Sequence, residues 1–125
     1  MGSRCTIVIE ADSEPDAASA ATAAFEEIAR IEQVLSDYRP DSEAMQLVRK
    51  APNQWHPVSE TLFEVLVRSM DIHKVTHGAF DPTVGAFTSL WRESSMPDKD
   101  SIKDAADRVG MIHVQLDPAS RSERL

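Results

Sequence analysis

Residues 77–85 read His77-Gly78-Ala79-Phe80-Asp81-Pro82-Thr83-Val84-Gly85 and close the strongest helical pattern in the chain. Gly78 can take the positive φ that ends a helix. Pro82 disfavours a helical conformation at Asp81 and suits the first turn of a new helix, which we expect to run towards Trp91. The turn gathers unpaired backbone N–H groups, which can bind an anionic ligand such as a pyrophosphate, or the Asp81 carboxylate acting as a helix cap.

Two long amphipathic helices are predicted before this turn. The first has Ser13 as its N-cap, Asp16 completing a capping box, and an end near Leu35. Its apolar residues share one stripe of helical period: Ala17, Ala21, Ala24, Phe25, Ile28, Ile31, Val34 and Leu35. The second is capped by Ser59, spans about residues 60–75 and has two apolar sides. Burying one large apolar side chain stabilises a fold by ~1.5–3 kcal/mol, so we expect both helices to pack on a sheet.

Two shorter helices are also predicted. Ser42 caps the first of them, and Asp98 or Asp100 caps the second, over residues 101–109. Gly110 is expected at the C′ position that ends the second helix.

Strands are few in this sequence. Residues 4–10 are rich in β-branched side chains and predict a strand buried on both faces, with Cys5 as a buried free thiol. Residues 113–117 predict a second strand, followed by a turn over residues 117–120. A two-stranded sheet is marginal in water and too narrow for these helices. We therefore predict an α+β fold that is incomplete in this chain: residues 1–125 form a fragment whose remaining strands are absent.

Composition limits the classes of function. The chain carries 21 acidic and 13 basic residues, which gives a net charge of −8. This charge argues against binding nucleic acid through its phosphates and against adsorption on anionic lipid. No apolar run approaches the roughly 20 residues that span a bilayer, and no apolar region of a signal peptide follows Arg4. We expect no membrane segment and no signal peptide in this chain, and its compartment stays open.

Three polar residues around the turn have a spacing that resembles a zinc site. On a continuous helix His73, His77 and Asp81, four residues apart, would share one face. Gly78 and Pro82 break that helix, and no glutamate stands between the histidines as a general base. A metal-dependent hydrolase using His73 and His77 is therefore kept only as an alternative. His73 is expected on the helix surface and His77 in its last turn.

Four stretches, in the same order, resemble landmarks of the ApbE family, the FAD:protein FMN transferases. Residues 78–85 with Leu90-Trp91 are similar to the family's G-A-F-D-P-T-V-G-P-L…W. Residues 35–43, LSDYRPDSE, resemble L-S-x-Y-x-P-x-S-E. Met1-Gly2-Ser3 resembles the opening M-G-T, and Val109-Gly110 before a short strand resembles the next landmark. The resemblance spans nearly the whole chain but only the N-terminal part of a family member.

The resemblance implies an enzyme that binds FAD with Mg²⁺ at the pyrophosphate. Such an enzyme transfers FMN to a threonine of a target flavoprotein and releases AMP. Phosphoryl-type transfer depends on positioning and on neutralising phosphate charge, with the metal as Lewis acid. The family's Mg²⁺ ligands and its D-x-G-G-I-x-K-G segment have no counterpart in this chain. We therefore expect one wall of an FAD site, with no catalytic residue and no metal ligand, and no activity from this chain alone.

The flavin-binding positions that match the family are Met1, Tyr38, Ala79, Phe80 and Asp81. Met1 suits a soft apolar contact with a ring. By its residue type Tyr38 can plug the end of the helical layer or pack on a flat ligand, and the resemblance favours the second role. Asp81 can hydrogen-bond a nucleotide, cap the next helix, or do both. Val48 and His77 depart from the family, which commonly has an asparagine at the first position and a small or acidic residue at the second.

Three functions from different classes follow. The favoured one is the N-terminal part of an FMN transferase, whose partners are FAD and a target flavoprotein. The second is a non-catalytic flavin-binding or interaction module derived from the same fold. The third is the hydrolase on His73 and His77. In all three, exposed apolar faces favour self-association. Family members often begin with a lipoprotein signal, which does not precede Met1 here.

Overall fold

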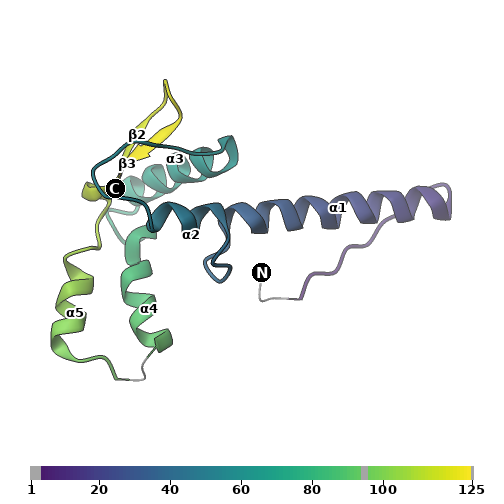
Figure 1. The fold of residues 1–125 in the computed structure, drawn as a ribbon. Coiled ribbons are helices and arrows are strands. Elements are labelled where there is room, and N and C mark those ends of the chain that lie inside the picture. The colour runs from purple at the N-terminus through teal and green to yellow at the C-terminus, as the bar shows by residue number, and fades with distance from the viewer. Residues whose placement is uncertain (1–3, 94–95, 125) are drawn as a thin grey trace. The chain divides into compact units, whose positions relative to one another are not determined.

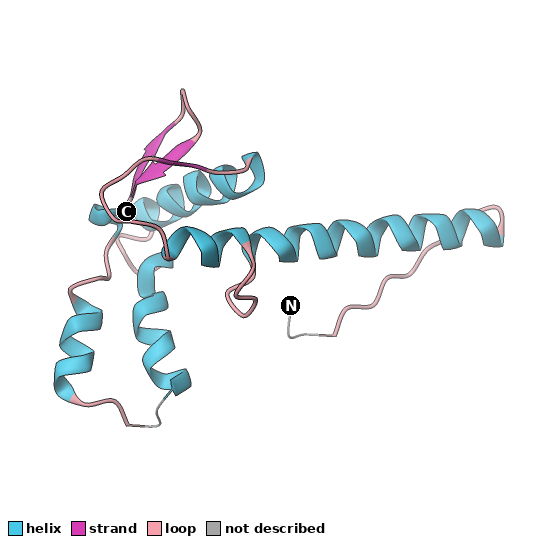
Figure 2. Ribbon diagram, viewed as in Figure 1, coloured by secondary structure: helices cyan, strands magenta, loops and turns pink. Residues whose placement is uncertain are grey.

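The computed structural model describes residues 4–93 and 96–124, which divide into two compact units. The first unit comprises residues 1–50 and the second residues 51–125. Helices dominate both units, and the strands lie in the second (Figures 1 and 2). The α+β fold class expected from the sequence is thus confirmed.

The first unit is built on α1 (Glu14–Leu35) and α2 (Glu43–Val48). The predicted capping box is present: the Ser13 hydroxyl accepts the Asp16 N–H at 3.3 Å and donates to Asp16 Oδ2 at 2.6 Å. Ser42 caps α2 by accepting the Met45 N–H at 3.2 Å. Both helix starts follow from local sequence, because N-cap bonds span only three residues.

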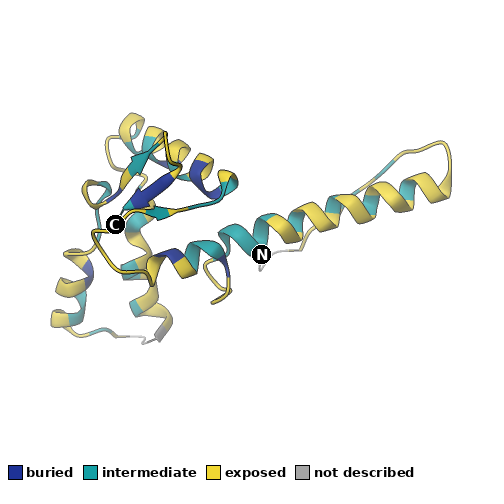
Figure 3. Cartoon of the chain, turned by 45° about the horizontal axis from the view of Figure 1, so that its top comes forward, coloured by how far each residue is buried: buried dark blue, intermediate teal, exposed yellow. Residues whose placement is uncertain are grey.

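The apolar stripe of α1 is not covered. None of the residues of α1 is buried, and Phe25 is 49% exposed (Figure 3). The expectation that α1 packs on a sheet is therefore wrong for this chain. The part of the first unit that the structure describes contains no strand.

The predicted strand over residues 4–10 is also wrong. These residues have no regular secondary structure, and Val8 is 92% exposed. Cys5 is exposed, so the prediction of a buried thiol is wrong as well. The physical reason is pairing: an extended segment becomes a strand only when a neighbour completes its hydrogen bonds, and the described sheet joins β1, β2 and β3 only.

The second unit holds a small antiparallel sheet with the order β1-β3-β2. Its strands are β1 (His56–Pro57), β2 (Gln115–Asp117) and β3 (Ser122–Arg124). β2 confirms the predicted strand over residues 115–117, but not its start, because His113 belongs to a 3₁₀ turn. The turn that follows is held by Asp117 Oδ1, which accepts the Ala119 N–H at 3.0 Å. β1 and β3 are too short to give a sequence signal of their own.

The second unit contains three α-helices and two 3₁₀ turns among its described residues. They are α3 (Glu60–Val75), the 3₁₀ turn η1 (Pro82–Val84), α4 (Gly85–Glu93), α5 (Lys99–Ala106) and the 3₁₀ turn η2 (Met111–His113). Ser59 caps α3 and Asp98 caps α5, as predicted. α5 ends at Ala106, so Gly110 does not end it; with φ 137° it begins η2 instead.

The core is small. Its buried apolar side chains, among the described residues, are Leu47, Leu62, Phe63, Ala105 and Val114. α3 shows the two apolar sides expected of it, but the side that carries Val65, Ile72 and Val75 is exposed. Among the described residues we find no helix long and apolar enough to cross a membrane.

Candidate functional site

Residues 77–85, called the site turn below, begin where α3 ends. Val75 is the last residue of α3, and Thr76 is its C-cap. Gly78 has φ 83° and donates its N–H to the His73 carbonyl at 2.9 Å. The glycine thus ends the helix as the sequence predicts, by offering a left-handed residue that returns a hydrogen bond to the last turn.

Asp81 is held in the extended conformation that Pro82 requires, with φ −136° and ψ 111°. Its Oδ1 accepts the Thr83 N–H at 2.8 Å and the Thr83 hydroxyl at 2.6 Å. The capping role of Asp81 is therefore confirmed. Its side chain is only 15% exposed. Oδ1 is used by the turn itself, because it accepts both hydrogen bonds from Thr83.

Thr83 connects the site turn to a second landmark of the sequence. Its hydroxyl oxygen accepts the Gly110 N–H at 2.7 Å, across 27 residues of sequence. Asp81, Thr83 and Gly110 form one chain of hydrogen bonds that holds the start of η1 to the start of η2. Sequence reasoning missed this role of Thr83, because a hydroxyl two residues after a capping aspartate is usually satisfied locally.

His73 is not the plain surface residue that the sequence predicts. Its ring is 27% exposed, and its Nδ1 lies 2.9 Å from the Phe80 carbonyl oxygen and 3.8 Å from Asp81 Oδ2. His77 lies beyond the end of α3 with φ 51° and is exposed, so it is not in the last helical turn as expected. The two histidines do not form a pair of ligands on one helix face.

No zinc site is assembled from these residues. Within residues 4–93 and 96–124 no group of three or more His, Cys, Asp or Glu side chains could hold a metal ion. The geometry thus gives no support to the hydrolase alternative on His73 and His77. The same finding means that the described residues do not fit a Mg²⁺ site.

Ala79 and Phe80 are exposed residues of the site turn. Phe80 is 39% exposed, and its backbone N–H is held by the Thr76 hydroxyl at 3.1 Å. Ala79 and Phe80 are thus exposed beside the largely buried Asp81 side chain, and the Phe80 backbone is held by Thr76. Their role as flavin contacts stays a prediction.

Tyr38 lies in the first unit, on the loop between α1 and α2. The Ser36 hydroxyl accepts the backbone N–H groups of Tyr38 and Arg39 at 3.3 Å each, and Arg39 pairs with Asp41 at 3.1 Å. The Arg39 guanidinium lowers the pKa of the Asp41 carboxyl below its usual value. The tyrosine is 73% exposed, which rules out the plug role and leaves its ring accessible. Met1 lies outside the described residues.

Glu123 on β3 is a titratable residue that sequence reasoning missed. It is 2% exposed, and its Oε2 has no hydrogen-bond partner. Burial raises the pKa of Glu123 to about 7, because an apolar environment disfavours the charged form. The register places Glu123 opposite Leu116 and His56, so these side chains share one face of the sheet.

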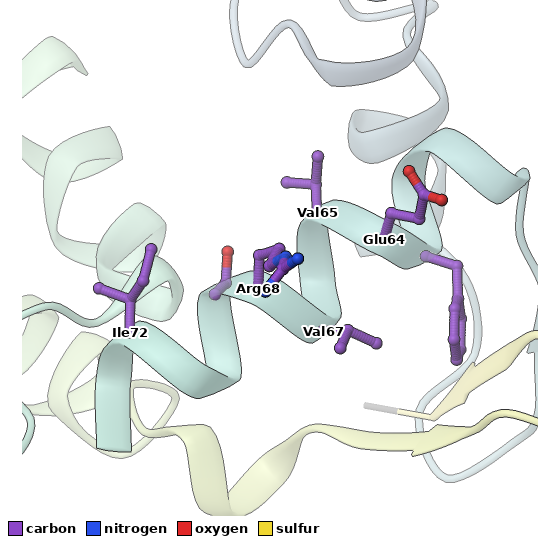
Figure 4. A pocket seen from close by; sticks show the side chains of 7 residues that line it. Glu64, Val65, Val67, Arg68 and Ile72 are labelled. Carbon is purple, nitrogen blue, oxygen red and sulfur yellow. The ribbon is translucent and has the colours of Figure 1, made fainter. Parts of the chain in front are cut away.

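An open groove of about 670 Å³ runs along α3 (Figure 4). Its lining residues all come from α3: Phe63, Glu64, Val65, Val67, Arg68, Ser69 and Ile72. None of these residues belongs to the site turn. The groove follows the exposed apolar side of α3, whereas the predicted contacts at residues 79–81 follow the C-terminal end of that helix.

Comparison with known proteins gives one consistent result. The model of the ApbE family matches residues 1–125. An FAD:protein FMN transferase of Klebsiella pneumoniae is 33% identical over 91 residues, covering 68% of this chain and 26% of that protein. One of Treponema pallidum is 32% identical over 102 residues, covering 75% of this chain and 28% of that protein.

Solved structures share the fold. The flavin transferase ApbE from Vibrio cholerae superposes with a TM-score of 0.82 at 19% identity, covering 92% of this chain and 38% of that chain. The ApbE protein from Thermotoga maritima gives 0.79 at 24% identity, covering 94% and 39%. This chain therefore spans about a quarter to two-fifths of the length of these proteins.

Proposed function

Because this chain belongs to the ApbE family, we propose that it supplies the N-terminal part of an FAD:protein FMN transferase. In the proposed reaction the bond between the FMN phosphorus and the bridging oxygen of FAD breaks. The FMN phosphate forms a phosphoester with a threonine hydroxyl of a target flavoprotein. The threonine loses its proton, and AMP takes the bridging oxygen. This chain contributes to holding the flavin substrate and not to the transfer step.

The observation that carries the proposal is the site turn. Its sequence is the family landmark, and its geometry leaves Phe80 exposed over a backbone fixed by Thr76 and Asp81. A fixed backbone with an exposed ring suits a flat ligand, because little conformational freedom is lost on binding. These features support a binding wall at residues 79–81.

Each predicted contact has a separate part in this proposal. Tyr38 offers an accessible ring that can stack on the isoalloxazine. Phe80, in the second unit, is proposed as a separate apolar contact with the flavin substrate. Asp81 keeps Oδ1 for the turn and can use Oδ2 to accept a hydrogen bond from the nucleotide. Met1 is proposed as a contact from the family landmark alone.

Magnesium is proposed for the whole enzyme, with its ligands outside this chain. When bound, the metal would neutralise charge on the phosphate oxygens of FAD. The described residues offer no group that fits it. In this proposal the chain contributes only the flavin side of the site.

The exposed apolar faces support the view that residues 1–125 are a fragment of a larger domain. α1 has no buried residue, and α3 exposes Val65, Ile72 and Val75. Family proteins that this chain resembles are much longer, since it covers 38% of one and 39% of another. We propose that the further strands of the family fold cover these faces.

Titration of FAD into the purified chain tests the proposal. We expect saturable quenching of flavin fluorescence, because stacking on Tyr38 quenches the excited ring. Tyr38→Ala should abolish the quenching and Tyr38→Phe should keep it, since only the ring is needed. Phe25→Ala, which removes another exposed aromatic ring, is the matched control and should leave the titration unchanged.

Two results would contradict the proposal. If a chain that is folded by circular dichroism gives no saturable quenching, the chain has no flavin-binding wall of its own. If this chain alone consumes FAD in the presence of Mg²⁺, its role is catalytic and not limited to binding. Quenching without any contribution to transfer in a longer family protein would favour the alternative of a non-catalytic flavin-binding module.

A further inference from the structure

His73 contacts the site turn both through its backbone carbonyl and through its ring. Its carbonyl accepts the Gly78 N–H at 2.9 Å and the Thr76 hydroxyl at 3.3 Å. Its ring reaches forward to the Phe80 carbonyl at 2.9 Å. One residue thus binds the start, the middle and the exposed end of the loop that leaves α3.

The hydrogen bond between His73 Nδ1 and the Phe80 carbonyl shows which ring nitrogen carries the proton. A carbonyl oxygen can only accept a hydrogen bond, so Nδ1 of His73 must carry the hydrogen that it donates to Phe80. When the ring is neutral, this is the Nδ1–H tautomer. Which nitrogen carries the proton in a histidine is set by such a neighbour.

The same ring lies over two further groups of the turn. A Cβ placed on Gly78 would stand 3.7 Å from His73 Cε1, so the ring packs across the glycine. Asp81 Oδ2 lies 3.8 Å from Nδ1, beyond hydrogen-bond distance but close to it. The imidazole therefore borders both the backbone of Phe80 and the one carboxylate oxygen of Asp81 that the cap does not use.

We propose that His73 is a positioning residue for the flavin-binding wall at Ala79, Phe80 and Asp81. It donates Nδ1–H to the Phe80 carbonyl and so holds the backbone that carries Phe80 and Asp81. This role rests on the proposed function. His73 lies outside the stretch that resembles the family landmark. A longer-range consequence is that the Asp81–Thr83–Gly110 bonds are held in place from α3.

Nuclear magnetic resonance of the 125-residue chain tests the hydrogen bond without any ligand. The ¹⁵N shifts of the neutral His73 ring should show Nδ1–H, whereas a free imidazole favours Nε2–H. Amide exchange at Phe80, Thr83 and Gly110 should rise about fivefold or more in His73→Ala, as expected from the loss of one hydrogen bond. Lys74→Ala, a matched change of an exposed neighbour on α3, should leave these rates unchanged.

The affinity for FAD tests the positioning role. We expect His73→Ala to weaken binding by about five- to tenfold, the value of one hydrogen bond. His73→Asn should recover most of the loss, because its amide N–H can reach towards the same carbonyl. If His73 only stabilised the fold, His73→Asn would not restore the affinity for FAD. Lys74→Ala should bind FAD as the original chain does.

The outcomes separate the two proposals. An Nε2–H ring, or unchanged amide exchange in His73→Ala, would overturn the role of His73 whatever FAD does. The expected tautomer and exchange in a chain that binds no FAD would overturn the proposed function and, with it, the positioning role. An affinity that His73→Ala leaves unchanged would overturn the positioning role alone.

Discussion

Glu123 has the least favourable environment of the ionisable residues for which we see a pKa shift. Its carboxyl is buried, its Oε2 has no partner, and burial raises the pKa from 4.5 to about 7. The folded chain therefore binds a proton more tightly than the unfolded chain does. Its contribution to stability is fully present below pH 4.5 and is lost as the pH rises to about 7.

We predict that the free energy of unfolding falls by about 3 kcal/mol over this interval through Glu123, following the shift of its pKa. Glu123→Gln should flatten the profile, because its amide does not titrate. Urea denaturation at several pH values measures the effect. Glu26→Gln, at an exposed position of α1, is a control that should keep the original slope. Equal slopes for Glu123→Gln and the original chain would contradict the assignment.

Thr83 shows how a single hydroxyl can join distant parts of the second unit. Thr83→Val keeps the shape of the side chain but removes the bonds to Asp81 and Gly110. We predict a loss of about 1–3 kcal/mol, because the Gly110 N–H is left without its acceptor. Thr88→Val on exposed α4 is the matched control, with an expected change within about 0.5 kcal/mol. A loss at Thr83 no larger than at Thr88 would argue against the link.

At the scale of elements, α1 and α3 differ in how many of their side chains are buried, although both helices are amphipathic. α1 has a capped start but no buried residue, whereas α3 buries Leu62, Phe63 and Ser69. Helices in water draw most of their stability from packing of the apolar face. α1 should therefore open by local unfolding more readily than α3.

Hydrogen–deuterium exchange of the two helices measures this difference. We predict that amides in the middle of α1 exchange at least tenfold faster than those in the middle of α3, because they open without breaking a core. Comparison should use central residues, which are free of fraying. Slower exchange in α1 would show that its apolar stripe is covered in solution.

At the scale of the whole molecule, few apolar side chains are buried and many are exposed. Val75 is 75% exposed and Phe25 is 49% exposed, in a chain with a net charge of −8. Charge repulsion opposes association, whereas the apolar faces favour it. The balance decides whether the chain remains monomeric.

We predict that the chain self-associates at micromolar concentration through its apolar faces. Sedimentation velocity should show a larger species whose share falls in Val75→Glu. Gln54→Glu adds the same charge at an exposed polar position and should leave the association unchanged. A stable monomer with a cooperative melt would contradict both this prediction and the proposal that the chain is a fragment.

Local sequence alone determined the helix starts at Ser13, Ser42, Ser59 and Asp98, the turn at Gly78 and Pro82, and the likeness to a known family. These features rest on contacts within a few residues, which any chain of this sequence can make. Residues 4–10, by contrast, have a strand pattern and no strand. Only the tertiary structure decided that outcome, the burial of Glu123, and the bonds from His73 to Phe80 and from Thr83 to Gly110. The reason is that each depends on which distant segment the folded backbone brings alongside, and a local pattern does not specify that neighbour.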